Sequence, residues 1–301
     1  MVRTAVIIPA LNEEKSIGKV VKDFRREIPD ADIIVYNNNS TDGTVEAAKK
    51  AGAKVLTETR RGKGFVMKSA LDNIDADYYV FVDGDDTYPA EDVKNLLKPV
   101  LDGECDMTVG SRIGDKESDS MKRLHVFGNW AIVTMINTSF GMKLEDVLSG
   151  YRVLNRNLAK HLNLISSGFE IETELTIRTL IENFRIKEVP IRYRSRPKGS
   201  ESKLDSFSDG FIILWTIITL LRDYRPMFLF SILSIVSLTI GLIISILSLT
   251  STPYSQMMML SLIASLSFII LGIQFIAIGL ILHSIRSQNI LLDQLIRRQL
   301  K

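Results

Sequence analysis

Two carboxylates one residue apart follow a strongly apolar stretch, and this spacing is typical of a cation site. Residues 78–82 read YYVFV, and Asp83-Gly84-Asp85 follows directly. Carboxylates clustered at a strand end repel one another unless a positive charge is present. A hard divalent cation held by one or two carboxylates and by substrate phosphates meets that need, and Gly84 permits close approach. The segment therefore predicts a divalent cation that neutralises a leaving diphosphate, with a plain acidic turn as the alternative.

The elements that would position these carboxylates alternate between two patterns. Runs rich in Val, Ile and Tyr predict strands at residues 4–8, 33–36, 54–57, 78–82 and 107–110. Amphipathic patterns predict helices at residues 16–27, 44–51, 64–74 and 90–101. This alternation indicates an α/β fold with a largely parallel sheet covered by helices.

Polar clusters follow three of the predicted strands, at residues 9–14, 37–43 and 83–86. Ligands of open α/β sheets bind at the carboxyl ends of the strands. The three clusters should therefore meet at one edge of the sheet, which predicts a nucleotide site there.

The C-terminal part of the chain has a different composition. Residues 226–282 contain no Asp, Glu, Lys or Arg. Two apolar stretches in it, residues 227–249 and 257–282, each exceed the ~20 residues that a helix needs to span a bilayer. A short turn with Pro253 separates them. We therefore predict a transmembrane hairpin within residues 226–284, with a buried helix pair in a soluble core as the alternative.

Basic residues flank the hairpin but are absent from its turn, so the positive-inside rule places both chain ends in the cytoplasm. The apolar run at the N-terminus is too short for a signal peptide. We expect a cytoplasmic catalytic domain at residues 1–208 and a basic tail at 285–301. Residues 209–225, with Trp215, should form an interfacial amphipathic helix; a helix packed on the catalytic domain is the alternative.

Bulk composition excludes several other classes. The net charge of +2 gives no electrostatic case for nucleic-acid binding. The single cysteine, Cys105, excludes an internal disulfide and a cysteine-rich zinc site, and we expect it to be a small buried residue. Homo-oligomerisation remains open.

Several short motifs occur in order along residues 1–204. They are VIIPALNEE at 6–14, NNNSTDGT at 37–44, RGKG at 61–64, DGD at 83–85, VGSR at 109–112, DVLSGYR at 146–152 and VPI at 189–191. Together they resemble the inverting family 2 glycosyltransferases of the GT-A fold. GFE at 168–170 and RSRPKGSESKL at 194–204 are most similar to the polyprenyl-phosphate sugar synthases, such as dolichyl-phosphate mannose or glucose synthase. The two-span tail most resembles archaeal enzymes that charge dolichyl phosphate for protein N-glycosylation.

The resemblance implies roles for the matching residues. Asp83 and Asp85 would bind Mg²⁺ or Mn²⁺, and with Arg112 they form the implied catalytic set. The implied nucleotide-binding residues are Pro9, Ala10, Leu11, Glu13, Asn37, Asn38, Asp42, Lys63, Asp83, Gly84 and Asp85. The implied acceptor-phosphate residues are Lys122, Arg123, Arg196, Ser202 and Lys203. A solvated basic face is the alternative for this last group.

The implied reaction needs no general base. A phosphate monoester has a second pKa near 6 and is largely dianionic at neutral pH, so it can attack the anomeric carbon directly and invert it. Glu170 and Glu172 could contact the sugar or the acceptor, although a solvent-facing helical position is the expectation for Glu172 and Glu174.

The donor base is inferred from two amides. Asn37 and Asn38 stand where relatives commonly carry Asp, and a carboxamide suits the N–H and carbonyl of uracil better than the paired donors of guanine. This favours UDP-glucose or UDP-N-acetylglucosamine over GDP-mannose; the alternative is that both asparagines shape the turn. Another lipid acceptor, or a membrane scaffold with a degenerate fold, are the remaining alternatives.

Overall fold

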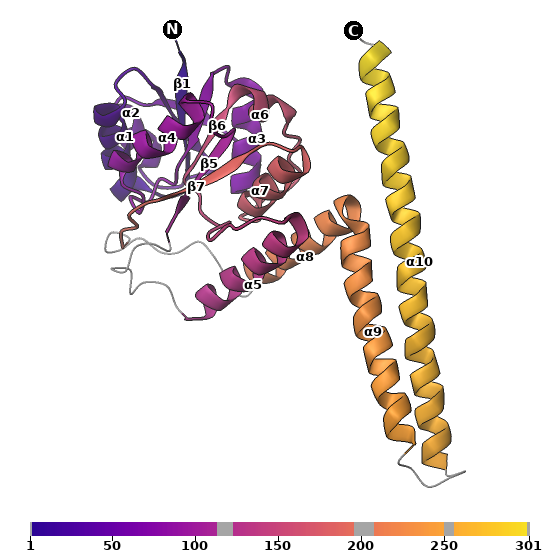
Figure 1. Ribbon diagram of the computed structural model, residues 1–301. Helices are drawn as coiled ribbons and strands as arrows, with labels where there is room; N and C mark the ends of the chain where they lie inside the picture. Colours follow the sequence, from indigo (N-terminus) through magenta and orange to yellow (C-terminus); the bar gives the residue numbers. More distant parts are fainter. Residues whose placement is uncertain (1, 113–122, 196–207, 250–255, 300–301) are drawn as a thin grey trace. The chain divides into compact units, whose positions relative to one another are not determined.

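The computed structural model describes residues 2–112, 123–195, 208–249 and 256–299. Its contacts divide the chain into two compact units, Met1–Thr216 and Ile217–Lys301. The first unit is the α/β domain, and the second holds two long apolar helices (Figure 1).

A seven-stranded sheet with the order β3-β2-β1-β4-β6-β5-β7 forms the first unit. The strands are β1 (Thr4–Ala10), β2 (Asp32–Asn37), β3 (Lys54–Thr57), β4 (Tyr78–Phe81), β5 (Met107–Ser111), β6 (Arg152–Asn155) and β7 (Ile186–Pro190). All neighbours are parallel except β6, which runs antiparallel to both β4 and β5. The predicted α/β fold is thus confirmed, and β6 and β7 add to the five predicted strands.

Helices cover both faces of this sheet (Figure 1). One face packs against α1 (Glu14–Glu27), α2 (Thr44–Lys50) and α4 (Val93–Leu101), the last preceded by the 3₁₀ turn η1 (Ala90–Asp92). The other packs against α3 (Lys63–Asn73), α6 (Arg156–His161) and α7 (Ile171–Ile181).

Alternating strand residues supply the two layers of the core. In β1, Val6 and Ile8 belong to the core on one face of the sheet, whereas Ala5 and Ile7 belong to the core on the other. A strand buried on both faces reads as a continuous apolar run, which is why β1 was visible in the sequence. Cys105 is buried, as expected, just before β5.

Two further helices belong wholly or partly to the first unit. Helix α5 (Arg123–Phe140) follows β5. Helix α8 (Ser208–Tyr224) crosses the boundary between the units and leaves Phe211 and Trp215 exposed. The helix predicted at residues 209–225 therefore forms; its position at a membrane interface stays a prediction.

The second unit is an antiparallel pair of apolar helices, α9 (Pro226–Ser248) and α10 (Gln256–Gln299). The segments long and apolar enough to cross a membrane are Pro226–Ser248 and Gln256–Gln288. Helix α10 continues to Gln299, so most of the predicted tail at 285–301 is helical. Charge marked the expected end of the span at residue 282, but charged side chains do not end a helix.

Candidate active site

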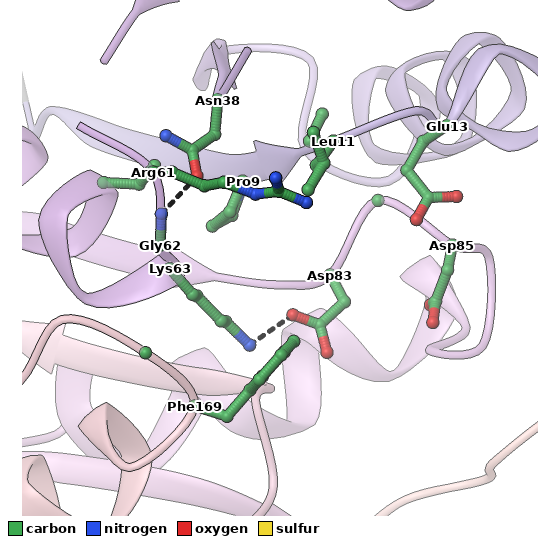
Figure 2. A pocket seen from close by; sticks show the side chains of 14 residues that line it. Pro9, Leu11, Glu13, Asn38, Arg61, Gly62, Lys63, Asp83, Asp85 and Phe169 are labelled. Atoms are coloured by element: carbon green, nitrogen blue, oxygen red, sulfur yellow. Dashed lines mark hydrogen bonds and ion pairs between the residues drawn. The ribbon is translucent and has the colours of Figure 1, made fainter. Parts of the chain in front are cut away.

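A cavity of about 340 Å³ opens at the carboxyl ends of β1, β2 and β4. It is lined by Pro9, Ala10, Leu11, Glu13, Asn38, Arg61, Gly62, Lys63, Val66, Asp83, Gly84, Asp85, Gly168 and Phe169. Figure 2 shows these side chains surrounding one space. The structure therefore brings together the predicted nucleotide-binding residues except Asn37 and Asp42, which do not line the cavity.

Asp83 and Asp85 lie in the loop after β4, and both line this cavity (Figure 2). Asp85 is buried, and its Oδ1 accepts hydrogen bonds from the backbone N–H and hydroxyl of Thr87 at 3.2 and 2.7 Å. A Cβ added at Gly84 would lie 3.3 Å from the carbonyl oxygen of Pro9. A glycine at this position thus lets the acidic loop pack against the end of β1.

The donor set fits a divalent cation completed by a substrate. Within the described ranges no group of three or more His, Cys, Asp or Glu residues is arranged to hold a metal ion by itself. Mg²⁺ commonly takes one or two carboxylates and completes its shell with water and substrate phosphates. Asp83 and Asp85 supply such a pair, and Figure 2 shows the Glu13 carboxylate turned toward Asp85.

Lys63 joins the acidic loop to helix α7. Its ammonium forms ion pairs with Asp83 and, at 2.5 Å, with Oε1 of Glu172. Burial alone would lower the pKa of Lys63, but the charges of the two carboxylates outweigh it and raise the pKa above its ordinary value. Lys63 is therefore a fixed positive charge in the cavity wall.

The expectation that Glu172 and Glu174 face solvent was wrong, because both side chains are buried. The two oxygens of Glu174 accept hydrogen bonds from the backbone N–H groups of Ile165 and Ser166, and Arg178 pairs with it at 2.6 Å. Burial raises the pKa of Glu172, partly opposed by the charge of Lys63. Both carboxylates of helix α7 therefore point into the protein.

The loop before α7 forms one wall of the cavity. Oε1 of Glu170 accepts hydrogen bonds from the backbone N–H groups of Ser167 and Gly168 at 3.0 and 2.9 Å. Glu170 is thus engaged by its own loop. This arrangement places Gly168 and Phe169 in the cavity.

The glycines of the RGKG motif let two backbones meet. The N–H of Gly64 donates to the carbonyl of Ser167 at 2.9 Å. A Cβ at Gly62 would lie 2.1 Å from the oxygen of Ser167, and one at Gly64 would lie 2.2 Å from that of Ser166. Gly62 also has φ = +132°, a conformation open mainly to glycine.

The amide of Asn38 holds the protein backbone. Its Nδ2 donates to the carbonyl oxygens of Glu58 and Arg60 at 3.0 and 2.7 Å, and its Oδ1 accepts from Gly62 N–H at 2.7 Å. Both N–H donors are thus engaged by the protein backbone, which favours the turn-shaping alternative, and a contact of this side chain with the base stays a prediction. Asn37 likewise accepts from Ser40 N–H at 3.0 Å.

Asp42 stabilises the start of helix α2. Its carboxylate accepts hydrogen bonds from the backbone N–H groups of Thr44 and Glu14 at 3.1 and 3.2 Å and from the Thr44 hydroxyl. Burial opposes ionisation of this carboxyl, but the hydrogen bonds lower its pKa below the ordinary value. These contacts explain why Asp42 lies outside the cavity wall.

The guanidinium of Arg112 forms a bidentate ion pair with the carboxylate of Asp146. Nε and Nη2 donate to the two oxygens of Asp146 at 2.7 and 2.8 Å, and Asp146 is buried. Arg112 does not line the cavity. The Asp146 carboxylate therefore occupies the pair of N–H donors that we expected Arg112 to offer to a phosphate. Carboxylate and phosphate groups can both accept two parallel hydrogen bonds from a guanidinium.

The predicted acceptor residues are not placed. Lys122, Arg196, Ser202 and Lys203 lie outside the described residues, and Arg123 begins helix α5 without a described side chain. Their roles stay predictions.

Several cavity-lining residues were assigned no role from the sequence, and two of them, Arg61 and Phe169, have long side chains. Glu172, expected to face solvent or to contact the sugar or the acceptor, instead pairs with Lys63 in the cavity wall. The first two stand inside motifs already visible, RGKG and GFE, so the motifs marked the place without marking the residue.

Comparison with known proteins agrees with this fold. Residues 5–162 match Glycosyl transferase family 2. Glycosyltransferase AglJ of Haloferax volcanii is 35% identical over 238 residues, which cover 79% of this chain and 78% of that protein. The dolichyl-phosphate hexose transferase of the same organism is 33% identical over 221 residues, covering 73% and 95%.

A solved structure shows the same architecture. Glucosyl-3-phosphoglycerate synthase from Mycobacterium tuberculosis, in complex with Mn²⁺ and UDP-glucose, superposes with a TM-score of 0.58 at 26% identity. The match covers 73% of this chain and 78% of that one. The chain therefore belongs to glycosyl transferase family 2, and it is a glycosyltransferase.

The close approach at Gly64 is testable. We expect Gly64→Ala to destabilise the protein by about 2 kcal/mol or more, because its Cβ would meet a backbone carbonyl that cannot turn away. Gly18→Ala in helix α1 is the matched control: the nearest atom is 3.7 Å away, and alanine favours a helix by about 1 kcal/mol. Thermal melting in detergent measures both variants, and equal Tm values would contradict the packing described.

Proposed function

We propose that this chain transfers a hexose from a nucleotide-sugar to a polyprenyl phosphate such as dolichyl phosphate. The observation that carries the proposal is a carboxylate-lined cavity in a family 2 fold, on a chain that also has two apolar helices long enough to span a membrane. The likeness to a dolichyl-phosphate hexose transferase over 95% of that protein supports a lipid acceptor.

In this proposal Asp83 and Asp85 hold Mg²⁺ or Mn²⁺ together with the donor diphosphate. When bound, the cation supplies positive charge to the diphosphate as it leaves. A dianionic lipid phosphate forms a new bond to the anomeric carbon while the bond to the diphosphate breaks, and the electron pair leaves with the diphosphate. Attack opposite to the leaving group inverts the sugar carbon, and no proton has to be removed from the acceptor.

The cavity also indicates how the donor would be held. Arg61 lines it and forms no ion pair with another described residue, whereas Lys63 is engaged by two carboxylates. Arg61 is therefore proposed as a cationic contact for the nucleotide. Lys122, Arg123, Arg196, Ser202 and Lys203 remain the proposed acceptor-phosphate set, and the membrane hairpin with both ends in the cytoplasm remains the proposed topology.

A lipid-product assay tests the function. Membranes containing the chain are incubated with dolichyl phosphate and radiolabelled UDP-glucose, UDP-N-acetylglucosamine or GDP-mannose, and the organic phase is analysed. We expect a labelled lipid with one donor. Excess EDTA should lower the yield of labelled lipid by about 10²-fold or more because it removes the cation, and Asp85→Asn should do the same because it removes the main cation ligand. Undiminished product in EDTA would contradict the metal role, and label confined to the aqueous phase would contradict the lipid acceptor.

The donor nucleotide is a separate question. We propose a UDP-sugar; the UDP-glucose complex of glucosyl-3-phosphoglycerate synthase supports this, while the amide protons of Asn38 are engaged by the protein backbone. Calorimetric titration with UDP and GDP in the presence of Mn²⁺ should give tighter binding of UDP, by about tenfold, equal to ~1.4 kcal/mol. Tighter binding of GDP would favour the mannose alternative.

The role of the hairpin can be tested by truncation. A chain ending at Tyr224 keeps the whole sheet and cavity, and we expect it to bind nucleotide as the full chain does. It should glycosylate dolichyl phosphate in vesicles at least about tenfold more slowly, because the local concentration of the enzyme at the membrane is lost. Equal rates on vesicles would mean that the hairpin does not serve the acceptor.

A further inference from the structure

Glu172 is a buried carboxylate with fewer polar partners than its burial requires. Its side chain is 5% exposed, and only Oε1 meets a charge, the ammonium of Lys63 at 2.5 Å. Oε2 is buried without a hydrogen-bond partner among the described residues. A buried oxygen without a hydrogen-bond partner destabilises the folded protein, so keeping this carboxylate in place has a cost in stability.

A second carboxylate on the same helix shows what a structural role looks like. Glu174 is also buried, but its oxygens receive two backbone N–H groups and an arginine. It ties helix α7 to the preceding loop and satisfies its own hydrogen-bonding needs. Glu172 does neither, so stability does not account for it.

What Glu172 does have is a connection to the acidic loop. Lys63 is only 11% exposed and contacts Asp83 as well as Glu172. The backbone closes around the pair, because a Cβ at Gly150 would lie 2.8 Å from both Lys63 Nζ and Asp83 Oδ2. The position of the Asp83 carboxylate therefore depends on Lys63, and the position of Lys63 depends on Glu172.

We propose that Glu172 is a positioning residue for the cation site: it shares the Lys63 ammonium with Asp83, so that Asp83 keeps enough negative charge to bind a divalent cation. This inference rests on the proposed metal role of Asp83 and Asp85. Without the charge of Glu172, Lys63 pairs with Asp83 alone and competes with the cation for that carboxylate.

Binding and stability separate this role from a structural one. Mn²⁺ is titrated calorimetrically into the full-length chain in detergent with excess UDP, and Tm is measured on the same samples. Glu172→Gln should raise the apparent Kd for Mn²⁺ by about fivefold or more without lowering Tm, because Lys63 keeps Asp83 as its ion-pair partner and the substitution removes a buried charge whose second oxygen has no described hydrogen-bond partner.

Asp106→Asn is the matched control. Asp106 is a carboxylate before β5, away from the cavity, and its oxygens are satisfied by Arg185 and Asn155. Its loss should lower Tm and leave the Mn²⁺ affinity within about twofold, because only its local contacts are removed. An Mn²⁺ affinity of Glu172→Gln equal to that of the wild type, or a loss of affinity that comes with a lower Tm, would overturn the proposal.

A double-mutant cycle tests the route through Lys63. In a Lys63→Gln background, Glu172→Gln should change the Mn²⁺ affinity by less than about twofold, because the shared ammonium is gone. The same loss in both backgrounds would mean that Glu172 acts on the cation directly and would overturn the positioning role. A wild-type chain that binds no Mn²⁺ with UDP would instead contradict the proposed metal function itself, and this inference with it.

Discussion

The surplus of negative charge where β4 ends is the constraint on which the cavity depends. Asp83 and Asp85 share one short loop, Glu172 lies behind it, and Lys63 is the cation placed among them. Asp83 and Glu172 share one ammonium, which cannot neutralise both, and burial makes the remaining negative charge more costly. A cation that arrives with the substrate, as proposed above, would relieve this repulsion when it binds.

Backbone contacts keep those charges at fixed positions. Asn38 ties the ends of β2 and β3 to Gly62, and Gly64 bonds to Ser167 in the loop before α7. Fully buried Arg152 donates to the carbonyls of Val147 and Ser149, in the loop whose Gly150 abuts Lys63 and Asp83. Burial lowers the pKa of Arg152 to about 10, so it still carries its charge at neutral pH. The cavity wall is thus ordered before any ligand binds, which reduces the entropy lost on binding.

The sequence predicted the parts of this site that are coded locally. Apolar runs located β1 to β5, and the polar residues after β1, β2 and β4 meet as expected because parallel strands end at one edge. Pairings between distant residues were not predictable. Arg112 binds Asp146 and Lys63 binds Glu172 across long sequence separations, and no local pattern distinguishes a buried carboxylate on α7 from an exposed one. The backbone contacts of Asn38 were unpredictable for the same reason, because an amide at a strand end can bind either a ligand or the backbone.

Hydrogen bonds and close packing of small residues hold helices α9 and α10 of the second unit together. Ser237 on α9 donates to the carbonyl of Phe268 at 2.7 Å, and Ser265 on α10 donates to that of Gly241 at 2.8 Å. A Cβ at Gly272 would lie 2.7 Å from Leu238, so the helices approach closely through small residues. Such contacts hold helices together where lipid removes the hydrophobic drive for association, while the exposed Ile and Leu side chains suit hydrocarbon rather than water. None of these contacts involves the cavity residues, so the affinity for a soluble donor and the affinity for a membrane can change independently of each other.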